Sequence, residues 1–229
     1  MEIAEQQFRK TLLSCNAKIR ELNSSLGNVY GDPARYDLAE TVGVGAVVVG
    51  DTLFYGGIED CYLNVLRGET LDNVAVWEYQ IMRAFRHMEG LSPDDLTRHL
   101  PQKKRKELLQ KGISDERRKE AYWCTHLRNN PDEFDQEGSL VGWGCFTGED
   151  DVAPFVQVHS LNLVRGDHVI LFSDGMIPVL EDDEFVKWFI AHAESSYQFQ
   201  VEMRGRIMDM LQDSPQKMHT ERTLMYHPY

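Results

Sequence analysis

The residues best suited to chemistry stand directly after an apolar run. Residues 169–172 are Val-Ile-Leu-Phe, and Ser173-Asp174-Gly175 follow them. A buried strand is a rigid support, Gly175 lets the backbone approach closely, and a carboxylate at such a strand end suits a divalent cation, because hard cations prefer oxygen ligands. The pattern therefore predicts that Asp174 is a metal ligand. The alternative is a turn residue whose carboxylate accepts hydrogen bonds from the backbone that follows.

Other potential ligands are less well placed. The acidic groups 149–151 and 181–184 resemble metal sites, but helix starts and solvated loops are rich in such residues, so metal binding there is the weaker interpretation. The histidines show no H-x-H or H-x-x-x-H pair. The four cysteines show no C-x-x-C pair and no zinc-ligand spacing, which favours a reduced, cytoplasmic setting.

Composition narrows the class of protein. A chain of 229 residues with 42% hydrophobic residues can bury one sizeable core, so we expect a single domain over residues 1–229. The net charge of −13 disfavours nucleic acid and anionic membranes as partners. No apolar run approaches the roughly 18 residues of a membrane helix, and the charged first 20 residues do not read as a signal peptide.

Helices and strands must position these side chains. Apolar residues at spacings of three and four predict an amphipathic helix over residues 1–26, which Gly27 ends. From residue 41, three short β-prone runs separated by turn-forming residues predict three consecutive antiparallel strands. Residues 71–130 are helix-forming and highly charged, which predicts a helical insertion. Its basic cluster, residues 102–106, is a solvated helix face or, alternatively, a phosphate-binding patch.

The second half of the chain returns to strands. Residues 154–164 and 168–175 predict a hairpin with Arg165-Gly166-Asp167 as its turn. Two helices are expected over 181–196 and 198–212, followed by a strand over 222–226. Strands, a helical insertion, further strands and two helices together predict an α+β domain with antiparallel sheets.

The stretch 163–176 resembles the signature of the type 2C (PPM) metal-dependent Ser/Thr protein phosphatases of the bacterial type. In that signature a Gly-Asp turn precedes a buried strand, and Ser-Asp-Gly follows the strand. Earlier segments are similar to the family pattern in the same order. Residues 40–47 resemble its Gly-Thr-Thr-Ala strand, and residues 57–62 its Val-Gly-Asp-Ser-Arg turn. In that turn Asp60 is retained, while Glu59 and Cys61 replace Gly and Ser.

Two further segments extend the resemblance to nearly the whole chain, about residues 1–226. Residues 126–130 and 142–149 look like a bacterial variant that carries an Arg-Asn pair and a Gly-x-x-Thr-Gly-Glu loop. At the closing motif the usual metal-binding Asp is replaced by Thr220, unless Glu221 shifts by one position to take its place. The family's amino-terminal Asp-Gly-His-Gly-Gly segment has no counterpart, so we expect the chain to be amino-terminally truncated relative to the family.

The resemblance implies a four-layer α/β/β/α sandwich and hydrolysis of phosphoserine and phosphothreonine. In the family, two Mn²⁺ or Mg²⁺ ions activate a water molecule for this reaction. The ligands expected in this chain are Asp174 and Glu221, which predicts one weak metal site, and the sequence assigns no catalytic residue. The missing strands predict an exposed sheet edge and a homodimer through it.

Two functions remain open from the sequence. The first is a metal-dependent phosphatase with an incomplete metal site, whose partner is a phosphoprotein substrate. The second is a catalytically inactive pseudophosphatase that serves as a binding or regulatory module for a protein partner. The substituted Thr220 favours the second function, and the intact signature over residues 165–175 favours the first.

Overall fold

The computed structural model describes residues 2–28, 38–59, 61–68, 71–76, 80–92, 95–98, 119, 122–193, 196–212 and 222–229. The chain folds as two compact units. Unit 1 comprises Met1–Asp60 and Val76–Asn162, and unit 2 comprises Cys61–Ala75 and Leu163–Tyr229. Each unit is described by itself, and the single domain over residues 1–229 stays a prediction. No helix in the described ranges is long and apolar enough to cross a membrane.

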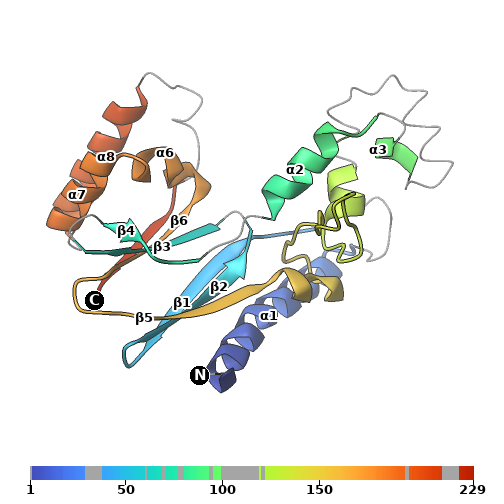
Figure 1. The fold of residues 1–229 in the computed structure, drawn as a ribbon, viewed down its shortest axis with the longest axis horizontal. Coiled ribbons are helices and arrows are strands. Elements are labelled where there is room, and N and C mark those ends of the chain that lie inside the picture. The colour runs from blue at the N-terminus through green and yellow to red at the C-terminus, as the bar shows by residue number, and fades with distance from the viewer. Residues whose placement is uncertain are drawn as a thin grey trace. The chain divides into compact units, whose positions relative to one another are not determined.

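Unit 1 contains a three-stranded antiparallel sheet in the order β1-β2-β5 (Figure 1). Strands β1 (Gly43–Val49) and β2 (Thr52–Ile58) form a hairpin whose two-residue turn holds Gly50 at a φ of +60°. Glycine suits this turn because it adopts positive φ without steric strain. Strand β5 (Gln157–Asn162) pairs with the other side of β2. The central strand β2 is therefore buried along most of its length.

Helix α1 (Glu2–Ser25) packs on this sheet and confirms the helix predicted over residues 1–26 (Figure 1). A Cβ atom built on Gly45 of β1 would lie 3.7 Å from the side chains of Phe8 and Leu12, an ordinary van der Waals distance, so these helix residues lie directly over the strand. Gly27, at a φ of +77°, follows the helix end. Helix α1, strand β2 and the 3₁₀ helix η3 (Asp150–Phe155) contribute side chains to one apolar core.

A second apolar core of unit 1 gathers short helical segments. These are α2 (Ile81–Glu89), α3 (Asp95–Arg98) and the π-type turn η2 (Trp123–Leu127). Within the described residues, the predicted insertion over 71–130 is thus largely helical, apart from the two-residue strand β4 (Asp72–Asn73) at its start. The basic cluster 102–106 lies outside the described residues.

Unit 2 contains a four-stranded antiparallel sheet in the order β4-β3-β6-β7. Strand β3 (Cys61–Arg67) pairs with β6 (His168–Ser173), and β6 pairs on its other side with β7 (Leu224–Pro228). The short helices η4 (Asp174–Met176) and α6 (Ile177–Leu180) follow β6 directly. Strand β6 is the apolar run identified in the sequence, and Val169 and Ile170 are at most 2% exposed.

Two longer helices cover the sheet of unit 2. Helix α7 (Asp183–His192) begins at Asp182, whose carboxylate accepts from the Phe185 amide. Helix α8 (Tyr197–Leu211) begins at Ser196, whose hydroxyl accepts from the Phe199 amide. Both caps satisfy amides that lack partners within their helix. The predicted helices over 181–196 and 198–212 are confirmed with slightly shifted ends.

Two pairings predicted from the sequence are wrong. Strand β3 does not continue the β1-β2 hairpin but pairs with β6, and β5 pairs with β2 and not with β6. The turn Val164–Asp167 does form, with the Asp167 amide donating to the Val164 carbonyl at 2.9 Å. It connects strands of two different sheets, since β5 pairs with β2 whereas β6 pairs with β3 and β7.

The predicted fold class is confirmed. All strand pairs described are antiparallel, and the chain mixes these sheets with helices, as an α+β protein does. Each unit consists of helices packed on one sheet, which is the content of one half of an α/β/β/α sandwich.

Candidate functional site

Asp174 stands at the end of β6, as the sequence predicted. Its side chain is exposed, whereas Gly175 and Met176 after it are buried. The Asp174 Oδ1 atom accepts a hydrogen bond from the Gly175 amide at 2.7 Å. This bond is the turn-capping contact of the alternative interpretation. It occupies one carboxylate oxygen and leaves the group in contact with solvent, so a ligand role and a capping role are compatible.

The start of strand β7 lies beside this strand end. The Ser173 amide donates to the Thr223 carbonyl at 3.1 Å, and the Thr223 amide donates to the Ser173 hydroxyl at 3.0 Å. These bonds extend the β6–β7 pairing to the residue before Asp174. Thr220 and Glu221, the two candidates for the second ligand, precede Arg222 and lie outside the described residues. Their predicted role stays a prediction.

The described residues do not form a two-metal centre. Two ions held about 3.5–4 Å apart need several bridging or flanking ligands. Within the described ranges no group of three or more His, Cys, Asp or Glu side chains is placed to hold a metal ion. A single carboxylate such as Asp174 fits one cation that keeps most of its water molecules. Among the described residues, Asp174 therefore offers one carboxylate to a cation at this strand end.

The turn between β2 and β3 is the second segment that resembles the phosphatase pattern. Glu59 occupies the position of the pattern's glycine and has a φ of +46°, a conformation in which glycine is less strained. Its side chain is 1% exposed, and its Oε1 atom accepts from the Gly144 amide at 3.5 Å. Glu59 is thus a buried structural carboxylate. Asp60, the retained acid of the pattern, lies outside the described residues.

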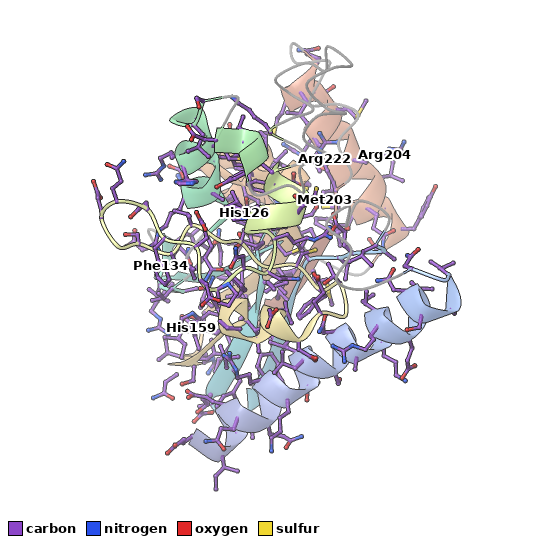
Figure 2. All side chains as sticks on the ribbon, turned by 90° about the vertical axis from the view of Figure 1, so that its right-hand side faces the viewer. His126, Phe134, His159, Met203, Arg204 and Arg222 are labelled. Atoms are coloured by element: carbon purple, nitrogen blue, oxygen red, sulfur yellow. The ribbon has the colours of Figure 1, made fainter. Side chains whose placement is uncertain are left out.

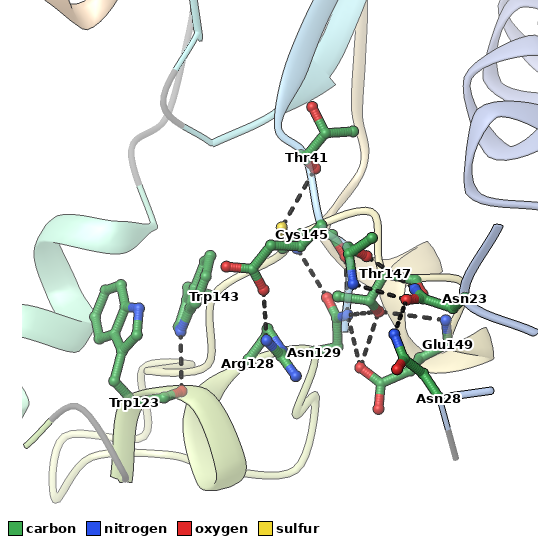
Figure 3. A network of polar contacts seen from close by, with 12 residues as sticks. Asn23, Asn28, Thr41, Trp123, Arg128, Asn129, Trp143, Cys145, Thr147 and Glu149 are labelled. Atoms are coloured by element: carbon green, nitrogen blue, oxygen red, sulfur yellow. Dashed lines mark hydrogen bonds and ion pairs between the residues drawn. The ribbon is translucent and has the colours of Figure 1, made fainter. Parts of the chain in front are cut away.

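The Arg-Asn pair and the Thr-Gly-Glu loop come together in unit 1 (Figure 3). The Asn129 side chain donates to the Cys145 carbonyl at 2.8 Å and accepts from the Cys145 amide at 2.9 Å. It also donates to the Thr147 hydroxyl at 3.0 Å and to Glu149 Oε2 at 3.2 Å. The Thr147 hydroxyl donates to the same carboxylate oxygen at 2.9 Å. Because these three side chains are at most 9% exposed, each depends on the others for its hydrogen bonds.

Helix α1 contributes two buried asparagines to this network. The Asn16 amide group donates to the Glu149 carbonyl at 2.8 Å, and its oxygen accepts from the Gly148 amide at 2.6 Å. The Asn23 amide group donates to the Thr147 carbonyl at 2.8 Å (Figure 3). The loop is therefore fixed from both sides. Glu149 therefore has a structural role, whereas Asp150 is exposed and forms an ion pair with Arg20 of α1.

Arg128 is buried beside this network. It is 1% exposed and forms an ion pair with Glu40, which precedes β1 (Figure 3). The neighbouring Cys145 lies against the Thr41 carbonyl, and burial raises the pKa of its thiol far above the ordinary value. A thiol with so high a pKa is not a nucleophile at neutral pH. The arrangement holds a loop in place, and nothing in it points to nucleophilic catalysis.

The turn before β6 holds a fully buried acid. Asp167 is 0% exposed, and its two carboxylate oxygens accept from Arg67 of β3 at 2.8 and 2.6 Å. It also accepts from the Val164 amide at 2.9 Å. Hydrogen bonding from Arg67 holds the pKa of this carboxyl below its usual range. Asp167 therefore fixes the turn and the start of β6.

Comparison with solved structures finds similar proteins at low sequence identity. The catalytic domain of the serine/threonine protein phosphatase PstP in complex with two manganese ions is 14% identical at a TM-score of 0.46, and the match covers 92% of this chain and 64% of that one. A serine/threonine phosphatase of S. agalactiae is 12% identical at a TM-score of 0.48, with coverages of 98% and 72%. PppA, a key regulatory component of the T6SS in Pseudomonas aeruginosa, is 13% identical at a TM-score of 0.45, and the match covers 96% of this chain and 68% of that one.

Two of these three proteins are named as serine/threonine phosphatases. The chain spans less than two thirds of the length of the PstP domain. No family model matches the sequence. No curated protein matches it either.

Sequence reasoning found Asp174 but missed several structural residues. Asn16 and Asn23 were not singled out, although both continue the helix stripe of Leu12 at spacings of four and seven. Polar residues on a buried stripe signal a buried hydrogen-bond network. The Arg67–Asp167 ion pair was also missed, because 100 residues separate its partners.

Proposed function

We propose that the protein is a phosphoprotein phosphatase of the metal-dependent type, in which Asp174 supplies one ligand to Mn²⁺ or Mg²⁺. The observation that carries the proposal is the exposed carboxylate at the end of buried strand β6, hydrogen-bonded to Gly175 and flanked by the start of β7. A bound divalent cation lowers the pKa of its water and so generates a nucleophile for phosphate esters. Glu221 is the proposed second ligand, and the proposed setting is the cytoplasm.

The substrate side of the proposal is a phosphoserine or phosphothreonine protein. Because the described residues supply one ligand of a two-ion centre, turnover by this polypeptide is expected to be very slow. The test is hydrolysis of p-nitrophenyl phosphate and of a phosphothreonine peptide at millimolar Mn²⁺. The expected result is a trace rate that chelator removes and that Asp174→Asn lowers at least tenfold. A trace rate that survives chelator or the substitution would contradict the proposal.

The same assay tests the account of the ligands. Turnover comparable with that of complete metal-dependent phosphatases, abolished by chelator, would show that ligands beyond Asp174 and Glu221 exist and that the account of an incomplete site is wrong. Asp183→Asn provides a matched control, because Asp183 is an exposed aspartate in the first turn of α7 and belongs to the same unit. Its rate is expected to equal that of the unmodified chain.

A second candidate function is a binding or regulatory module. It is favoured by one observation, that the described ranges contain no cluster of three potential metal ligands. This function predicts binding of a phosphothreonine peptide without hydrolysis, with an affinity that chelator does not change. Fluorescence anisotropy of a labelled peptide, measured with Mn²⁺ and with chelator, separates the two functions.

We also propose that β1 is the edge through which two copies pair. Within the described residues β1 pairs with β2 alone, and Val47 and Val49 are 42% and 60% exposed. In a two-residue hairpin the flanking pair, Val49 and Thr52, exchanges hydrogen bonds, so Ala46 directs its amide away from β2. Ala46→Pro removes that donor and is expected to shift a dimer to monomer in light scattering. A monomeric unmodified protein would refute this pairing.

A further inference from the structure

Unit 2 contains a cavity of about 890 Å³ between α7, α8 and β7. Its volume falls within the range of roughly 300–1,000 Å³ that is typical of small-molecule sites. Phe189 and Ala193 line it from α7, Phe199 and Ile207 from α8, and Leu224 and Tyr226 from β7. The walls therefore come from three elements that share one apolar core.

The apolar side chains that line the cavity can adapt their shape to a ligand. Phe199 and Ile207 belong to the buried core, at 8% and 7% exposure, and extend it to the cavity surface. Met203 and Met208 add two flexible thioether side chains on the same helix. Methionine adjusts its shape to irregular apolar partners. A flexible hydrocarbon chain would fit such a surface without a fixed hydrogen-bond pattern.

Two arginines are part of the cavity lining. Arg204 of α8 and Arg222 before β7 both line it, and Figure 2 shows both near Met203. Among the described residues, the side chains that line the cavity include no Asp or Glu, although the whole chain has 37 acidic and 24 basic residues. Arg204 is exposed, and within the described ranges no ion pair involves it. The local charge thus opposes the charge of the molecule as a whole.

We propose that this cavity binds a free single-chain amphipathic carboxylate, such as a fatty acid. The hydrocarbon chain lies against Phe199, Ile207 and Leu224, and the carboxylate faces the exposed Arg204. The guanidinium group binds a carboxylate through two parallel hydrogen bonds, which explains a preference for an anionic head over a neutral one. The site does not include Asp174 and does not depend on a metal ion, so it stands apart from the proposed phosphatase function.

The test is calorimetric titration of the full chain with dodecanoate below its micelle concentration, with dodecanol as the neutral analogue. We expect saturable one-to-one binding of dodecanoate and at least tenfold weaker binding of dodecanol. Arg204→Gln should weaken dodecanoate binding about tenfold, because it removes one charge-assisted partner. Lys187→Gln removes an exposed cation of α7 that does not line the cavity, and should leave the affinity unchanged.

A second variant tests the position of the hydrocarbon chain. Ala193→Leu places a larger side chain at the cavity wall and is expected to weaken dodecanoate binding, while an unchanged unfolding transition shows that the protein is intact. The proposal is overturned if dodecanoate does not bind, if dodecanol binds equally well, or if Lys187→Gln weakens binding as much as Arg204→Gln. Binding seen only with anionic vesicles would equally contradict a site for the free molecule.

Discussion

Strand β6 has an aspartate at each end, and the surroundings of the two differ. Asp167 at the start is 0% exposed and accepts two hydrogen bonds from Arg67 and one from the Val164 amide. Asp174 follows the strand end, is exposed, and accepts from the Gly175 amide. The same residue type therefore stabilises the fold at one end and offers a carboxylate to solvent at the other. Burial and partners, and not sequence alone, assign the two roles.

The largest effect on stability is expected for Asp167→Asn. The substitution removes the charge that Arg67 faces and breaks a two-pronged ion pair, one partner of which is fully buried. Breaking buried pairs costs about 3–5 kcal/mol, and the 33% exposure of the Arg67 side chain reduces the expected loss to about 2–3 kcal/mol. Urea denaturation measures this change in the free energy of unfolding. If Asp167→Asn lowers the free energy of unfolding no more than the surface variant Asp183→Asn does, the structural role of Asp167 is contradicted.

A smaller but clear effect is expected for Asn129→Ala in unit 1. The alanine leaves the Cys145 amide and the Glu149 carboxylate without their Asn129 partner. It also places alanine at a φ of +50°, which asparagine tolerates better. Together these predict a loss of about 2 kcal/mol. Asn130→Ala is the matched control, because Asn130 is only partly buried and its amide group bonds the His126 carbonyl, and it should lose less than half as much.

The pH dependence of stability should separate acids from histidines. Burial lowers the pKa of His168, so the folded state resists its protonation and stability falls as the pH drops below about 6.5. Arg67 lowers the pKa of Asp167, so that contribution is present at neutral pH and disappears as the pH falls below about 4. Urea denaturation between pH 8 and 3 should show both declines in the unmodified protein. Asp167→Asn should reduce the decline below pH 4 and should deepen the decline below pH 6.5, because the Asp167 charge raises the pKa of His168.

Local patterns predicted the elements of this fold better than their partners. The spacing of apolar residues found α1, and the apolar run found β6 with Asp174 at its end. The hairpin predicted between residues 154–164 and 168–175 was wrong, because β5 and β6 each pair with a strand about 100 residues away. A turn signal such as Arg165-Gly166-Asp167 fixes a change of direction and not the strand that lies alongside.

The same holds for the candidate site, where local patterns predicted the position of a residue but not its tertiary partners. Asp174 could be found from residues adjacent to it in the sequence, because a strand end and a glycine define its position. The structural roles of Glu59 and Glu149 could not, since they depend on Gly144 and on Asn129, which are distant in the sequence. Buried carboxylates and solvent-facing ones have the same letters in a sequence, and only the tertiary partners distinguish them.

The central claim is that Asp174 holds the divalent cation, and a calorimetric titration with Mn²⁺ tests it most directly. The unmodified chain is expected to bind one ion weakly, because one carboxylate leaves most ligands to water. Asp174→Asn should weaken this binding at least tenfold and change the unfolding temperature without metal by very little, because the amide oxygen can still accept from Gly175. Asp183→Asn should bind as the unmodified chain does. An Mn²⁺ affinity unchanged by Asp174→Asn, or no binding at all, would contradict the account.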